Sequence, residues 1–128
     1  MEDRRDELAL HGENLACAHL VEQGWDIVDR NVTWKLGEID VVARKALDGG
    51  ELWAIVEVKT RRGKGPPYPE DNVTAAKRRK LAKLGQLYLQ ENRLYGVVMR
   101  FDVIGIDVCG EEFELRHHEA AFDAWGRI

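Results

Sequence analysis

Hydrophobic positions recur along this chain with two different periods, and the change of period separates predicted helices from predicted strands. A spacing of three to four residues, which places side chains on one face of a helix, runs over residues 5–23. Gly24 follows that segment and is a typical helix stop. The same spacing returns after Asn72 or Thr74, either of which can cap a helix that runs to about Asn92. Two long amphipathic helices are therefore expected.

Short runs rich in β-branched and aromatic residues, bounded by turn residues, predict the strands. Strands are expected over residues 25–33, 36–44, 52–60, 96–108 and 112–117. A bend is expected near Gly105, and residues 118–125 are expected to form a short closing helix. Residues 63–69 have the composition of a loop. This order, α-βββ-α-β(β)-α, predicts an α/β fold with a mixed sheet flanked by helices.

The composition is that of a folded globular chain, with 45% hydrophobic and 33% charged residues among 128. This length and the lack of a linker indicate one domain spanning residues 1–128. No apolar run is long enough to cross a bilayer, and the charged N-terminus lacks a signal-peptide core, so no membrane association is expected. Cys17 and Cys109 have no paired spacing, which argues against a disulfide framework or a zinc ribbon and favours the cytoplasm.

Charge is distributed unevenly along the chain. The net charge is −4, yet residues 59–83 contain nine basic and two acidic residues, a local balance of +7 that leaves −11 for the rest. A basic stripe of this kind can bind phosphate, although it can also be a solvated lysine-rich helix face. The candidate nucleic-acid contacts in this stripe are Arg61, Arg62, Lys64, Lys77, Arg78 and Lys80.

Two short motifs carry the candidate chemistry. Asp40 ends a Gly-Glu-Ile-Asp motif in the second predicted strand, and Glu57 and Lys59 lie at the end of the third. If these strands form a hairpin, Asp40 and Glu57 lie side by side, where two carboxylates repel unless a cation lies between them. Hard oxygen ligands favour Mg²⁺ or Mn²⁺, and Lys59 would place a positive charge beside the ion. Solvent-facing charges on an edge strand are the alternative, but they do not explain why charges end so apolar a strand.

Two helical residues could join this site. Glu13 lies at the border of the apolar face of the first helix, where it is either a further metal ligand or an ordinary surface glutamate. Lys77 falls at the centre of the apolar face of the long helix. It would reach the rim beside Glu57, contact a phosphate or contribute only packing.

Other polar and aromatic residues are interpreted structurally. Arg100 and Asp102 share a strand face, so we expect a structural ion pair between them. His117 and His118 are adjacent and point apart, which argues against a shared metal ion. Trp34 precedes the Gly-Glu-Ile-Asp motif, and packing is favoured over stacking on a base.

At this point the chain resembles the YraN-like family within the PD-(D/E)xK restriction-endonuclease-like superfamily. The matching stretches cover nearly the whole chain in order: Gly12-Glu13, Arg30-Asn31, Gly37 to Asp40, Val56 to Arg61, Lys77 with Leu81, Arg100 to Val103, and His118 to Phe122. The resemblance implies a restriction-endonuclease-like core related to archaeal Holliday-junction resolvases. It also implies that Glu13, Asp40, Glu57 and Lys59 form the metal and catalytic site. The chain departs from the superfamily pattern at Ile39, where proline often precedes the aspartate.

These observations lead to the hypothesis of a metal-dependent endonuclease. Asp40 and Glu57 would hold Mg²⁺ or Mn²⁺, with Glu13 and the Val58 carbonyl as further ligands, and Lys59 would orient a water molecule. The expected substrate is DNA rather than RNA, with branched or single-stranded features, and a homodimer would suit a branched substrate. Two alternatives stay open: a nucleic-acid-binding module that keeps the fold without efficient catalysis, and a protein-interaction or assembly factor.

Overall fold

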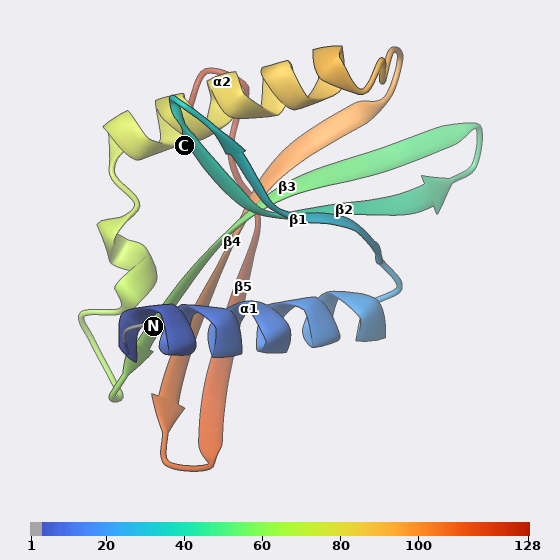
Figure 1. Cartoon of the computed structure of the whole chain (residues 1–128). Coiled ribbons are helices and arrows are strands. Elements are labelled where there is room, and N and C mark those ends of the chain that lie inside the picture. The colour runs from blue at the N-terminus through green and yellow to red at the C-terminus, as the bar shows by residue number, and fades with distance from the viewer. Residues whose placement is uncertain (1–3) are drawn as a thin grey trace.

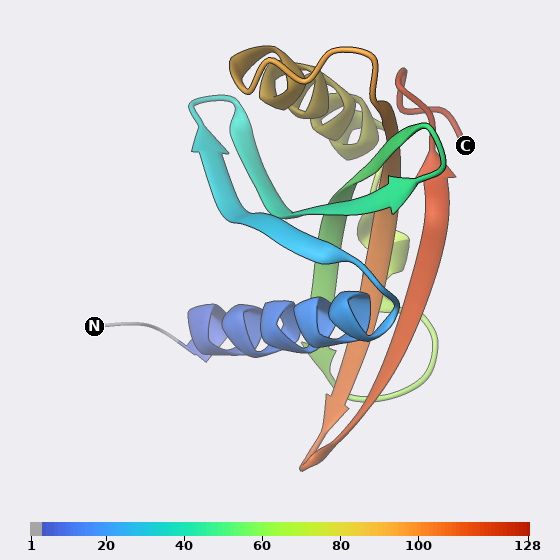
Figure 2. The same cartoon turned by 90° about the vertical axis from the view of Figure 1, so that its right-hand side faces the viewer.

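The computed structural model describes residues 4–128 and consists of one five-stranded mixed sheet with a long helix on each face (Figures 1 and 2). Its elements are α1 (Arg4–Glu22), β1 (Asp26–Trp34), β2 (Gly37–Leu47), β3 (Gly50–Arg62), the short 3₁₀ helix η1 (Pro69–Asn72), α2 (Ala75–Glu91), β4 (Val98–Cys109) and β5 (Glu112–Phe122). The strands lie in chain order across the sheet. All neighbours are antiparallel except β3 and β4, which are parallel and connected through α2. The predicted mixed α/β fold is confirmed.

The two faces of the sheet bury separate apolar clusters, one under each helix. On one face, α1 packs through Ala16 and Leu20 on small and β-branched residues such as Ala54 and Val56. On the other, α2 packs on aromatic side chains that include Trp53. Alternation of side chains along β3 gives it buried residues on both faces, which explains its nearly continuous apolar run. No described helix is long and apolar enough to span a membrane.

The predicted boundaries of the second long helix are close to those observed. Thr74 is the N-cap: its hydroxyl accepts a hydrogen bond from the Lys77 backbone N–H at 3.2 Å, which settles the choice between Asn72 and Thr74. The segment expected to be a loop is irregular up to Tyr68 and then enters η1.

The predicted closing helix at residues 118–125 is wrong. β5 continues to Phe122, whose ring stacks on Phe101 with centroids 5.0 Å apart. A register shift opposite Ala120, which has a positive φ of 46°, lets its backbone N–H donate to the Asp102 carboxylate at 3.0 Å. These long-range contacts override the helix-like local composition. A turn over residues 123–127 closes the chain.

Strand pairing is continuous at Gly105, where the sequence predicts a bend. The parallel register between β3 and β4 runs without interruption from Leu52 and Val98 past Gly105. Glycine is needed there for a different reason, because a Cβ atom would lie 1.9 Å from the Glu70 carboxylate oxygen. The glycine therefore lets η1 dock closely on β4.

Candidate metal centre

Close packing of α1 on β3 brings Glu13 to the sheet. A Cβ atom on Gly12 would lie 1.8 Å from the Thr60 hydroxyl oxygen, so only glycine allows this approach. The adjacent Glu13 is consequently buried, with 8% of its surface exposed. Carboxylate oxygens of Glu13, Glu38 and Asp40 all lie within 4.8 Å of one another. The helix therefore adds a third carboxylate to two supplied by β2.

Asp40 lies where β2 and β3 separate. The residue pairs between these antiparallel strands begin at Val41 and Val56, one step beyond Asp40. Its Oδ2 accepts a hydrogen bond from the Val58 backbone N–H at 2.8 Å, so a side-chain oxygen replaces the backbone carbonyl that would accept this bond in a continuous strand pair. Burial, and after it the neighbouring Glu57, raise the pKa of Asp40 to about 8, although the hydrogen bond from the Val58 N–H opposes both effects. This carboxylate is therefore held in a place where its negative charge is destabilised.

Glu57 lies beside Asp40, and its carboxylate is paired with α2. It is 4% exposed, and its Oε2 lies 3.3 Å from Lys77 Nζ. The predicted approach of Lys77 to Glu57 is thus confirmed. The same Oε2 is buried and makes no hydrogen bond of good geometry to a described residue. A buried carboxylate oxygen without such a partner is a candidate ligand atom.

Lys59 lies between two adjoining hollows. The first, of about 370 Å³, contains the carboxylate cluster, and the second, of about 400 Å³, extends toward η1. The first is lined by Leu8, Ala9, Glu13, Glu38, Asp40, Val58, Lys59 and Thr60. The Lys59 amine forms no ion pair with the part of the chain that the structure describes. It is therefore free to contact a ligand in either hollow.

Three residues that the sequence hypothesis left out of the site, Arg30, Asn31 and Glu38, lie around Glu13. Burial raises the pKa of Glu13, and a hydrogen bond with Asn31 partly offsets that effect. Arg30 Nη2 lies 3.7 Å from Glu13 Oε1 and donates to Asn14 at 2.8 Å. Glu38 was the easiest of the three to find, because it lies two residues before Asp40 in a strand. Asn31 carries a positive φ of 53°, a conformation that asparagine adopts more readily than most residues, and Arg30-Asn31 is among the stretches that carry the family resemblance.

The donor set fits a hard divalent cation. Carboxylates from α1 and β2 converge, burial disfavours the charges of Glu13 and Asp40, and Glu57 supplies a buried oxygen beside them. A cation relieves exactly this kind of repulsion, and oxygen ligands favour Mg²⁺ or Mn²⁺ over zinc. Glu57 is outside the cluster of three whose oxygens lie within 4.8 Å. Of the predicted ligands, Glu13 and Asp40 therefore lie close together, Glu38 joins them, and Glu57 lies beside Asp40 outside the cluster.

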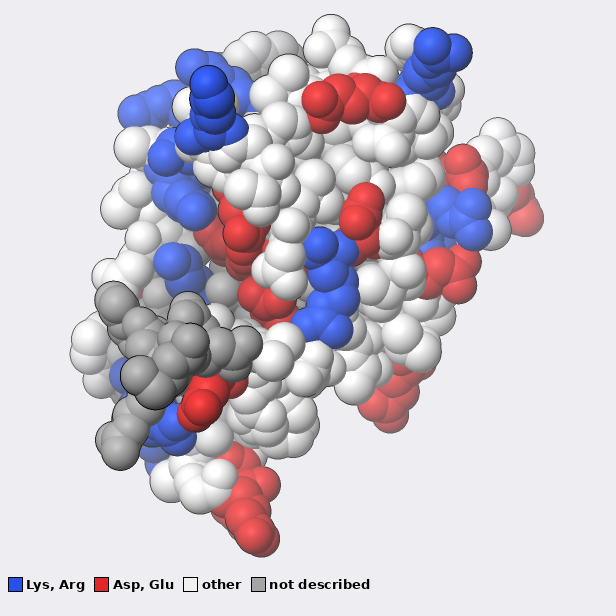
Figure 3. All heavy atoms as spheres, in the orientation of Figure 1, with Lys and Arg blue, Asp and Glu red and all other residues white. Residues whose placement is uncertain are grey.

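The predicted nucleic-acid contacts fall into two groups. Arg61 donates to Asp107 at 3.0 Å and to the Pro67 and Gly65 carbonyls, so it fastens a loop to the sheet. Arg78 likewise donates to the Gly126 and Val73 carbonyls, and Lys77 pairs with Glu57. Arg62, Lys64 and Lys80 are exposed and have no ion pair with described residues. Figure 3 shows basic side chains gathered at the upper left, where α2 begins, and acidic side chains in the middle of the same face.

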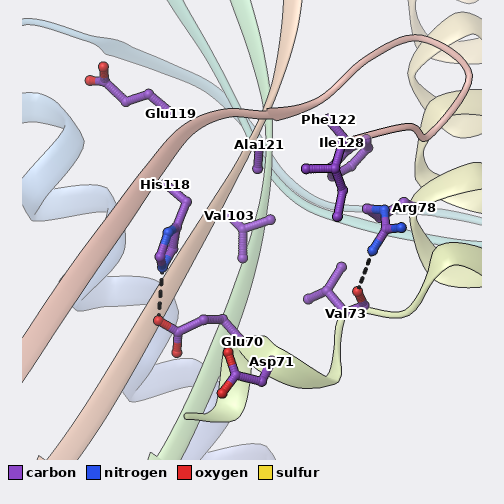
Figure 4. Close-up of a pocket in the computed structure, with 10 residues that line it drawn as sticks. All are labelled: Glu70, Asp71, Val73, Arg78, Val103, His118, Glu119, Ala121, Phe122 and Ile128. Carbon is purple, nitrogen blue, oxygen red and sulfur yellow. Dashed lines mark hydrogen bonds and ion pairs between the residues drawn. The ribbon is translucent and has the colours of Figure 1, made fainter.

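A further hollow of about 400 Å³, between η1, β5 and the C-terminal residues, contains structural contacts (Figure 4). Arg78 donates to the Val73 carbonyl at 3.1 Å, and His118 Nε2 lies 2.9 Å from a Glu70 oxygen. These contacts assign both residues to packing of the second helix and η1.

The expected ion pair between Arg100 and Asp102 is confirmed, with two contacts of 3.0 and 3.1 Å. His117 Nε2 also lies 2.7 Å from the buried Asp102, and its other ring nitrogen lies 3.0 Å from His19. Trp34 is half-buried and donates to Glu91 at 2.7 Å, as expected for a packed residue.

Comparisons with known proteins give the following matches. The model of a family described as "Uncharacterised protein family UPF0102" matches residues 12–106. A UPF0102 protein of Syntrophotalea carbinolica is 42% identical over 96% of this chain and 97% of its own length. One from Symbiobacterium thermophilum is 45% identical over 75% of this chain and 78% of its own. The structure titled "The structure of Pyrococcus Furiosus SfsA in complex with Ca2+" aligns with 84% of this chain and 62% of that one, at 14% identity. The TM-score of that alignment is 0.33.

Proposed function

This chain belongs to the family UPF0102, and we propose that it is a metal-dependent endonuclease with a PD-(D/E)xK core that hydrolyses phosphodiester bonds in DNA. One observation carries the proposal: Asp40 lies beside Glu57 where β2 and β3 separate, Lys59 lines the same hollow as Asp40, and α1 delivers Glu13 there. That arrangement combines hard oxygen donors with an unpaired cation beside an open hollow. It fits phosphoryl transfer better than a purely structural role, since burial and neighbouring carboxylates destabilise the charges of Glu13 and Asp40, and a bound cation would offset that cost.

Each residue of the site has a definable task. Asp40, Glu13 and Glu57 would hold the ion, and the Val58 N–H fixes the orientation of Asp40. A bound Mg²⁺ or Mn²⁺ would polarise the phosphate and acidify water. Lys59 would position the attacking water and neutralise charge that develops on the phosphate oxygens. Lys77 holds Glu57 in place through their 3.3 Å ion pair.

Cleavage assays test the proposal directly. Labelled linear, flapped and four-way-junction DNA, with RNA of matching shape, would be incubated with the protein and Mg²⁺ or Mn²⁺, and with EDTA as the blank. Glu57→Gln and Lys59→Ala are each expected to reduce the cleavage rate at least about 100-fold. The matched control is Glu51→Gln, which alters a glutamate at the far end of the same strand, where it pairs with Arg44.

The result would also discriminate between the alternatives. Metal-dependent cleavage that survives in Glu51→Gln and is lost in the two site variants supports the endonuclease. A folded wild-type protein that binds DNA without cutting it, and binds equally after Glu57→Gln, is a binding module. Lack of both cleavage and DNA affinity at low salt would favour an assembly factor.

A further inference from the structure

The C-terminal turn presents a tryptophan to solvent. Trp125 is 69% exposed, whereas large aromatic residues are usually mostly buried. Hydrogen bonds define the backbone of this turn: the Asp123 carboxylate accepts from the backbone N–H groups of Trp125 and Arg127, both at 2.9 Å. The exposed ring is therefore held on an ordered turn.

This turn is docked on the first part of α2. The Gly126 carbonyl accepts a hydrogen bond from Arg78 Nε at 2.9 Å. A Cβ atom on Gly126 would lie only 2.7 Å from the Arg79 backbone nitrogen, so the turn and the helix backbone are in close contact. Trp125 consequently has a fixed place beside the helix.

Beside the tryptophan lies a hollow whose charged lining is entirely basic. It has a volume of about 270 Å³ and is lined by Arg79, Ala82, Lys83, Gln86, Ala124 and Trp125. Arg79 and Lys83 are exposed and have no ion pair with the part of the chain that is described. A third cation, the guanidinium of Arg127, lies 5.1 Å from the centroid of the Trp125 ring. Arg127 also pairs with Asp123 at 3.3 Å, which leaves Arg79 and Lys83 as the cations available to a ligand. An aromatic face next to two such cations suits a nucleobase and its phosphate.

The basic residues of α2 connect this hollow to the candidate metal centre. Lys77 points toward β3, where it pairs with Glu57, and the Lys80 side chain lies over Gly37 of β2. At about 100° per residue, Lys83 and Arg79 follow around the solvent side of the helix and reach Trp125. The one acidic residue of α2 is Glu91, at its end. Cationic side chains therefore run from the site, across one helix, to the exposed ring.

From this arrangement we propose that Trp125, with Arg79 and Lys83, is a base-stacking site for a single-stranded segment of nucleic acid. The segment's phosphates follow the basic side chains of α2, and one base stacks on the indole. The inference deepens the proposed function, since it assigns a single-stranded arm of the substrate to the face of α2 next to the C-terminal turn.

Binding without metal separates this inference from catalysis. A fluorescently labelled single-stranded oligodeoxynucleotide would be titrated in EDTA, and its anisotropy measured, alongside an abasic oligonucleotide of equal length. Trp125→Ala is expected to weaken binding of the normal oligonucleotide about tenfold, and Trp125→Phe to restore most of it. Tyr95→Ala is the matched control, because Tyr95 is also an exposed aromatic, at 77%, and lies beyond the other end of α2. The exposure of Trp125 makes its truncation a mild change for folding.

The outcomes are distinct. A loss specific to Trp125→Ala, absent in Tyr95→Ala and absent with the abasic oligonucleotide, supports the stacking site, even if the wild type proves unable to cleave DNA. Equal affinities of Trp125→Ala and Tyr95→Ala overturn it, even if cleavage of junction DNA is observed. Equal affinity of the wild type for the normal and abasic oligonucleotides also overturns it, because the surface would then bind only charge.

Discussion

The surroundings of Asp40 control whether its carboxyl group is protonated. Its carboxylate takes a backbone hydrogen bond from Val58 at 2.8 Å and lies beside Glu57 in a buried place. Burial, with Glu57 second, raises its pKa to about 8. The protonated form is therefore favoured up to that pH, and the cation that we propose for this site would have to displace the proton.

The stability of the metal-free protein should consequently fall as pH rises. Because the pKa of Asp40 is higher in the folded than in the unfolded chain, its contribution is full below pH 4 and is lost as pH rises toward 8. Asp40→Asn removes that loss, so at pH 8 in EDTA its melting temperature should exceed that of the wild type by about 5 °C, and by less at pH 5. Mn²⁺ at pH 8 should raise the melting temperature of the wild type only. Parallel pH curves for the two proteins would contradict the assignment.

At the scale of elements, the site depends on how closely α1 approaches β3. Gly12 meets Thr60 without room for a side chain, and Glu13 is carried by the same helical turn. The position of Glu13, a proposed ligand, is thus determined by helix packing.

Gly12→Ala should therefore affect stability and metal binding together. The added methyl group must push α1 away from the sheet, with an expected loss of about 1–3 kcal/mol in unfolding free energy and weaker Mn²⁺ binding. Gly50→Ala is the control, since a Cβ atom there has no heavy atom within 4 Å. Urea denaturation and calorimetric titration with Mn²⁺ measure the two effects. Wild-type Mn²⁺ affinity in Gly12→Ala would show that Glu13 is not a ligand.

At the scale of the whole molecule, buried charges tie distant parts of the chain together. Arg116 of β5 pairs with Glu70 of η1 at 2.7 Å and with Asp107 of β4 at 3.1 Å, and Asp107 also pairs with Arg61 of β3. Burial raises the pKa of Glu70, but hydrogen bonds from Arg116 and His118 outweigh it and lower the pKa to about 2. This network holds the segment that follows β3 against the sheet, and with it the second hollow next to Lys59.

Arg116→Ala should destabilise the protein by about 3–5 kcal/mol at pH 7, because two buried carboxylates lose a partner. Lys35→Ala, at an exposed position in the turn before β2, should change stability by less than about 0.5 kcal/mol. Since the Glu70 pKa is depressed, its stabilisation is present above pH 4.5 and lost as pH falls to 2. The difference between wild type and Arg116→Ala in chemical denaturation should shrink over that range. A constant difference would show that Glu70 contributes little.

The sequence by itself determined the succession of helices and strands up to β5, the Thr74 or Asn72 cap, and the motifs containing Asp40, Glu57 and Lys59. These follow from local periodicity and spacing, which a chain displays without folding. Only the tertiary structure decided that residues 118–122 continue a strand, because pairing with β4 and stacking on Phe101 override their helical composition. It also decided which carboxylates lie close together. Glu13 reaches Asp40 because Gly12 lets α1 approach β3, and Glu38 and Asp40 lie just before the first residue pair between β2 and β3. Long-range packing of this kind leaves no periodic signal in the sequence.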